Sequence, residues 1–163
     1  MKKTKYVSAF FFQFLFAGIL AFSIQQSALA QAKEEIIPST KHAGYSVKPG
    51  MGPEKGFQGY MLYRRTNLKD LLEEGKRMPG DTLNFKQCIG ITMMGAKSDL
   101  KTEIQLTKVT TAKNNLKFYF TSKTGKKQSK FTVPLYVGTI PKQLGIKGIQ
   151  FYMDGKLLED VHN

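Results

Sequence analysis

Residues 83–94 read Leu-Asn-Phe-Lys-Gln-Cys-Ile-Gly-Ile-Thr-Met-Met and carry the strongest indication of the fold class. The stretch first alternates between apolar and polar residues and then becomes continuously apolar. Such a run is typical of a strand in the interior of a sheet, covered on both faces. The sequence therefore predicts a central strand here.

On the C-terminal side, residues 102–111 alternate with Ile104 and Leu106 on one face, which predicts a second strand. Asn114-Asn115 predicts a turn, because asparagine tolerates positive φ, and residues 116–121 then return as the hairpin partner. The polar stretch 122–130 is expected to be a loop.

Two more strands and a second hairpin are expected after that loop. Residues 131–140 predict a strand with an edge or a bulge at Pro134, because proline cannot donate to a ladder. Residues 148–153 and 156–158 flank Asp154-Gly155, a strong short-range hairpin signal.

On the N-terminal side, the aromatic-rich residues 57–64 predict a strand and residues 67–75 a short helix. Leu68 and Leu71 share a helix face with Leu72. Asn67 or Thr66 is expected to cap the first turn, and Gly75 to take the left-handed position after the last turn. With one helix and six or seven strands joined by short turns, we expect a β-rich α+β fold, mainly an antiparallel sheet or sandwich.

The first residues have the pattern of an export signal. Lysines precede an apolar run that reaches about Phe22, and Ala28-Leu29-Ala30 forms an Ala-x-Ala cleavage site. We predict a signal peptide over 1–30, a Pro/Gly-rich arm or linker over 31–56, and a single β-rich domain over 57–163. The protein is therefore expected to be exported to the periplasm or secreted, without a transmembrane segment after cleavage.

Composition restricts the possible chemistry. The chain has 163 residues, about one domain's worth, with one cysteine and two histidines. A single cysteine excludes an intrachain disulfide framework and a Cys-cluster zinc site. The net charge is +13. Removal of the three lysines in the signal leaves 22 basic against 12 acidic residues, a net of +10.

No set of residues predicts catalysis. His42 lies in the Pro/Gly arm and His162 next to the C-terminus, where a base is poorly oriented, so both are interpreted as solvated surface residues. Cys88 is interpreted as a small buried hydrophobe. The carboxylate pairs, Glu73/Glu74 on the expected helix and Asp99/Glu103, are interpreted as solvated. We expect no catalytic residue, no metal site and no cofactor.

Positive charge gives the binding candidates. Lysines cluster in the 122–130 stretch, and two arginines lie between the first strand and the helix; the candidate partner- or anion-binding residues are Lys123, Lys126, Lys127, Lys130, Arg64 and Arg65. A local positive field attracts anionic polymers and lipids.

The order of these features resembles the C-terminal domain of the PrcB family, the accessory lipoproteins of a bacterial protease complex. The likeness covers about residues 57–158. It includes the leucine-paired helix, the entry Leu83-Asn84-Phe85, the apolar strand ending at Gly95, and the Pro-containing strand 131–137. The family's usual Asp-Phe is Asn84-Phe85 here, and the lipobox of a lipoprotein is missing. The resemblance implies a non-enzymatic domain that binds or stabilises an exported protein.

Three functions are therefore compatible with the sequence. The first is an exported accessory module that binds a protease or another envelope protein. The alternative is a basic module that binds an envelope polyanion such as lipopolysaccharide or an acidic glycan, with no nucleic acid expected as a partner. A small hydrolase is the least favoured.

Overall fold

One long β-ribbon organises the fold. Strands β6 (Cys88–Gly95) and β7 (Ser98–Ala112) form one arm, and β8 (Asn115–Thr132) and β9 (Leu135–Pro141) form the other. Antiparallel pairing runs from Cys88↔Pro141 to Ala112↔Asn115. Between the two halves, the Gly95 N–H donates to the Pro134 carbonyl at 2.9 Å, so the ladder continues across the break. The ribbon bends back there, and its halves enter different sheets.

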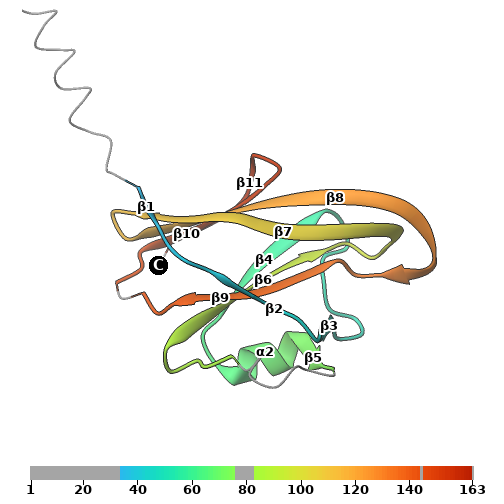
Figure 1. Ribbon diagram of the computed structural model, residues 1–163, viewed down its shortest axis with the longest axis horizontal. Helices are drawn as coiled ribbons and strands as arrows, with labels where there is room; N and C mark the ends of the chain where they lie inside the picture. Colours follow the sequence, from blue (N-terminus) through green and yellow to red (C-terminus); the bar gives the residue numbers. More distant parts are fainter. Residues whose placement is uncertain (1–33, 76–82, 144, 163) are drawn as a thin grey trace, which may run out of the picture. The chain divides into compact units, whose positions relative to one another are not determined.

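The computed structural model (Figure 1) describes residues 34–75, 83–143 and 145–162. The predicted signal peptide 1–30 lies outside the described residues. The chain from Glu34 onward forms one compact unit. The remaining elements are β1 (Glu35–Ile36), β2 (Thr40–His42), β3 (Tyr45–Val47), β4 (Phe57–Leu62), α2 (Arg65–Leu71), β5 (Leu72–Glu74), β10 (Gly148–Met153) and β11 (Lys156–His162).

The strands form two main sheets. The large sheet has the order β1-β7-β8-β10-β11, the small sheet has the order β2-β9-β6-β4, and β3 pairs with β5 separately. Neighbouring strands are antiparallel except β8 and β10, which run parallel. The predicted β-rich α+β fold with one short helix is confirmed.

Two apolar clusters hold the layers together. The larger one contains Ile91 and Met93 from the small sheet and Phe118, Phe120 and Phe151 from the large sheet, all at most 2% exposed. The smaller cluster lies on the other face of the small sheet, beneath α2 and the β3–β5 pair. β6 contributes to both clusters and is therefore buried on both faces, as its continuous apolar run predicts.

Two glycines allow the close approach of the layers. A Cβ atom added to Gly59 on β4 would lie 2.4 Å from the ring of Phe151, which belongs to the opposite sheet. A Cβ atom added to Gly90 on β6 would lie 2.9 Å from Leu62 in the smaller cluster. A side chain at either position would push packed side chains apart.

Along one side of the sandwich, a short segment of the chain is hydrogen-bonded to both sheets. Along the other side, no ladder among the described residues connects the two sheets. On the first side, β1 pairs with β7 and β2 pairs with β9, so the short segment 35–42 is hydrogen-bonded to both sheets. On the other side, β4 ends the small sheet and β11 ends the large sheet. We call this second side, formed by β4 and β11, the open side.

Several boundaries differ from the sequence prediction. The segment expected to be an arm without strands contains β1, β2 and β3, because neighbouring strands supply their hydrogen bonds. The N-cap is Arg64, so the cap predicted at Asn67 or Thr66 is wrong. The helix begins at Arg65, and the Asn67 side chain, inside the first turn, accepts from the Arg64 N–H at 3.1 Å. It ends in extended backbone at Leu72, so the left-handed cap predicted at Gly75 is wrong.

The turns illustrate the local chemistry. The hairpin turn at the ribbon tip is formed by Lys113 and Asn114, with φ of 50° and 66°, one residue earlier than predicted. Asp154 and Gly155 have φ of 50° and 79° and join β10 to β11, as their sequence predicts.

Candidate functional site

His42 and Cys88 have the most reactive side-chain types among the described residues. Each forms a polar contact with another part of the chain. His42 is half-buried on β2, and its Nε2 lies 2.9 Å from Oγ1 of Thr139, rather than being solvated as predicted. The Cys88 thiol is half-buried and donates to the Asn84 carbonyl at 2.9 Å. Burial raises the pKa of Cys88, so the thiol stays protonated at neutral pH and is a weak nucleophile.

One carboxylate of each candidate pair forms an ion pair with a basic residue. Glu73 and Glu74 lie on β5, not on the helix, and Glu74 pairs with Arg65 at 3.5 Å. Asp99 pairs with Lys127 at 3.0 Å. Within the described ranges, no group of three or more His, Cys, Asp or Glu side chains converges as a metal-ligand set.

The four candidate lysines lie on a strand, not in a loop. β8 continues through 122–130, where its register partners include Glu103 opposite Lys123 and Leu100 opposite Lys127. We call residues 97–104 and 121–132 the distal ribbon. It carries Lys97, Lys101, Lys123, Lys126, Lys127 and Lys130, all exposed, against Asp99 and Glu103. Six positive and two negative charges give this part of the ribbon a net charge of +4.

The distal ribbon extends beyond the strands that flank it elsewhere. β10 pairs with β8 only as far as Phe120, and β1 pairs with β7 only at Thr110 and Thr111. Beyond those points the two strands continue alone, and β8 curves around the end of β7 (Figure 1). Their side chains are consequently exposed, apart from residues such as Ile104, which is buried against the core.

The candidate arginines are separated from these lysines along the fold. Arg64 and Arg65 lie at the start of α2, which packs with the smaller cluster, whereas the lysines lie on the large sheet. Arg65 is in addition paired with Glu74. The structure therefore brings together the four lysines, and the arginines form a separate group.

The edge strand β11 carries a second candidate surface, formed by exposed apolar side chains. Leu157, Leu158 and Val161 are 49%, 39% and 40% exposed, which places three large apolar side chains on one edge strand. A bulge interrupts the register with β10, since Leu158 is the extra residue between the pairs Phe151↔Glu159 and Tyr152↔Leu157. Sequence reasoning missed this surface, because nothing in the residues 156–162 shows that the strand ends a sheet.

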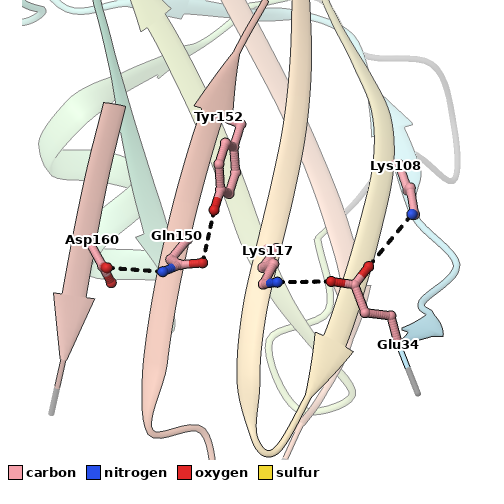
Figure 2. A network of polar contacts seen from close by, with 6 residues as sticks. All are labelled: Glu34, Lys108, Lys117, Gln150, Tyr152 and Asp160. Atoms are coloured by element: carbon pink, nitrogen blue, oxygen red, sulfur yellow. Dashed lines mark hydrogen bonds and ion pairs between the residues drawn. The ribbon is translucent and has the colours of Figure 1, made fainter. Parts of the chain in front are cut away.

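On the outer face of the large sheet, a polar network links β11 to its neighbour β10 (Figure 2). The Tyr152 hydroxyl donates to Gln150 at 3.1 Å, and the Gln150 amide donates to Asp160 of β11 at 2.9 Å. A second set of contacts joins Glu34, just before β1, to β8 and β7: its carboxylate accepts from Lys117 at 2.8 Å and lies 3.7 Å from Lys108. The hydrogen bond from Lys117 lowers the pKa of Glu34.

An aromatic row lies beside this network. Tyr119 and Tyr152 stack with centroids 4.9 Å apart and an interplanar angle of 15°. The Lys108 Nζ lies 5.5 Å from the Tyr119 centroid, and register places Leu157 opposite Tyr152. The row thus runs from β7 to β11 and ends at the exposed apolar edge.

Comparisons with protein-family models, curated proteins and solved structures find no match to this chain. In the described part of the chain, no helix has the length and apolarity of a membrane span.

Proposed function

We propose that this chain is an exported, non-enzymatic module that binds another exported protein, a protease being one class of partner, and that β11 is its contact strand. The observation that supports this proposal is the position of β11. It ends the large sheet on the open side and exposes Leu157, Leu158 and Val161. Apolar side chains gathered on a sheet edge are a recurrent feature of protein contacts.

An edge strand can receive an extended segment of a partner. As the last strand of the large sheet, β11 pairs with β10 on one side. A partner strand can pair along its other side while its side chains contact the exposed apolar residues. The bulge at Leu158 divides the edge, so we expect backbone pairing along 159–162 and apolar contact with Leu157 and Leu158.

The polar network supports the same proposal. Gln150 holds Asp160, and Gln150 is itself held by Tyr152, which stacks on Tyr119. These contacts fix β11 before a partner arrives, and an edge ordered in advance loses less conformational entropy on binding. A non-enzymatic role is consistent with His42 and Cys88, whose polar contacts go to Thr139 and Asn84.

Site-specific photo-crosslinking in the exporting cell tests this proposal. A photoreactive amino acid replaces Leu157 or Val161 in turn, and matched controls carry it at Ile36 and Met51, which are 75% and 44% exposed on other elements. We expect both β11 positions to give the same discrete adduct, identified by mass spectrometry, and the control positions to give none. Indistinguishable adducts from all four positions would contradict the proposal.

Affinity measurements on the protein so identified complete the test. Val161→Lys places a charge in the apolar contact, and we expect it to weaken binding roughly tenfold, the effect of losing one well-buried apolar contact. Ile36→Lys is the matched control with the same change of charge, and we expect unchanged affinity. Equal affinities for both variants would remove β11 from the interface.

A further inference from the structure

The distal ribbon combines positive charge with exposed apolar side chains. Phe131 is 64% exposed and Leu100 is 38% exposed, and both lie among the six lysines of this surface. Five of those lysines form no ion pair within the described part of the chain; Lys127 pairs with Asp99. The surface is independent of β11 and of the function proposed for it.

Two bulges place extra residues on β8. Between the pairs Ser98↔Thr132 and Leu100↔Lys127, β7 has one residue and β8 has four, namely 128–131. Between Leu100↔Lys127 and Thr102↔Thr124, β7 again has one residue and β8 has two. The extra length lets β8 follow the outside of the bend, and the bulged stretches contain Lys126, Lys130 and Phe131. Bulges re-aim side chains relative to the regular ladder.

Protection of a bare edge explains only part of this pattern. Lysines on an unflanked strand discourage edge-to-edge association, and the distal ribbon has two such edges. Protection does not account for Phe131, because an exposed aromatic side chain on a bare edge favours association instead. The phenylalanine beside Lys130 therefore requires another explanation.

The pairing of lysines with an aromatic side chain distinguishes among anionic partners. A soluble polyanion, such as an acidic glycan, would neutralise the lysines and leave Phe131 in water. An anionic bilayer satisfies both, because its headgroups attract basic residues, each contributing to affinity, and its interface accepts an aromatic ring. We propose that the distal ribbon docks on an anionic lipid surface, with Phe131 entering the interface between headgroups and acyl chains.

A single fluorophore tests this proposal directly. The chain contains no tryptophan, so Phe131→Trp introduces a unique reporter at the predicted point of insertion. We expect its emission to shift to the blue with vesicles of phosphatidylcholine and phosphatidylglycerol, and brominated lipid to quench it. Ile36→Trp is the matched control, exposed on β1, and we expect no shift. Heparin, a soluble polyanion, should leave the Phe131→Trp emission unchanged.

Vesicle co-sedimentation measures the two contributions separately. Replacing Lys123, Lys126 and Lys130 with serine should weaken binding to anionic vesicles a hundredfold or more, roughly the effect of three headgroup-attracted charges. Replacing Lys55, Lys86 and Lys142 removes the same charge from exposed positions elsewhere and should weaken binding much less. Phe131→Ser should weaken it roughly tenfold, since an apolar side chain is no longer buried. All variants have the same residues before Glu34, so any contribution of those residues to vesicle binding is the same in every variant.

The outcomes are distinct. Loss of binding in the lysine variant with no change in Phe131→Ser, and no emission shift at position 131, would overturn the proposal, because the contact would then be purely electrostatic with no entry of Phe131 into the interface. Absence of any difference between the two triple-lysine variants would also overturn it. Neither result affects crosslinking at β11, so failure of this proposal is distinguishable from failure of the proposed function.

Discussion

The two halves of the β7–β8 hairpin share the same strands and differ in everything that covers them. In the half nearest the tip, Val109, Phe118 and Phe120 are buried against the small sheet, and β10 extends the ladder. In the distal ribbon the residues are mostly exposed, charged or hydroxylated. The covered half therefore provides the stability of the hairpin. The side chains of the distal half contribute little to the core and are available for contact with a partner or a lipid surface.

The largest expected effect is the loss of an aromatic ring in the covered half. Phe118 is fully buried and stacks on Phe151 with centroids 5.2 Å apart. We expect Phe118→Ala to lower the free energy of unfolding by about 3–5 kcal/mol, measured by urea denaturation. Phe131→Ala in the distal ribbon is the matched control, with an expected change within about 0.5 kcal/mol. Similar losses in both variants would show that the distal ribbon contributes as much to stability as the covered half.

Two glycines, one in the small sheet against the covered half and one in the distal ribbon, differ in the space available for a side chain. Gly59→Ala would place a Cβ atom 2.4 Å from the Phe151 ring, and we expect a loss of about 1–3 kcal/mol from overpacking. At Gly125 in the distal ribbon, the added Cβ would lie 3.4 Å from the Lys101 carbonyl, close to ordinary contact. We therefore expect Gly125→Ala to have little effect on the denaturation midpoint. A larger loss at Gly125 than at Gly59 would show that the distal ribbon is the more tightly constrained half.

The smallest effect concerns the point where one half passes into the other. Asp154 accepts from the Ser122 N–H at 2.9 Å and from its hydroxyl at 2.7 Å, and these bonds lower the pKa of Asp154. Because the folded-state pKa lies below the ordinary value of 3.8, the stabilisation is present above that pH and is lost as pH falls through the folded pKa. We expect Asp154→Ala to lose about 1 kcal/mol at neutral pH.

Unfolding midpoints measured over a pH series check this coupling. The difference between the wild type and Asp154→Ala should shrink as the pH falls below 3.8. Asp154→Asn is the control that retains an acceptor and tolerates positive φ, and its difference from the wild type should also shrink in acid. A gap that stays constant across the series would indicate that the carboxylate charge is not involved.

The predictability of each segment follows from whether its own side chains are buried. The periodic apolar residues of 102–111 and 116–121 report the core they face, so these strands were predictable. Residues 122–132 have no apolar period, and their strand geometry comes from the ladder that continues from the covered half. β1 and β2 likewise depend on partners far along the chain, which one sequence does not show.

The candidate site divides in the same way. The lysine cluster was visible, because charge is a property of the residues themselves. The exposure of Phe131 was not visible, since an aromatic residue before the Thr-Val-Pro run has the pattern of a core strand. The exposed edge at β11 depends on strand order, which includes the parallel pairing of β8 with β10. Topology of that kind is set by packing between sheets.

The continuous ribbon from 88 to 141 also has a consequence for the order of folding. Its contacts are nested around the turn at Lys113 and Asn114, so each new pair closes only a short additional loop, and the ribbon can zip from the tip outward. The β8–β10 pairing cannot form this way, because the connecting chain must first cross to the small sheet as β9 and return. The entropic cost of loop closure is therefore higher for this parallel contact than for each new pair of the ribbon. We therefore expect it to form after the β7–β8 ladder and to open before that ladder under native-state hydrogen exchange.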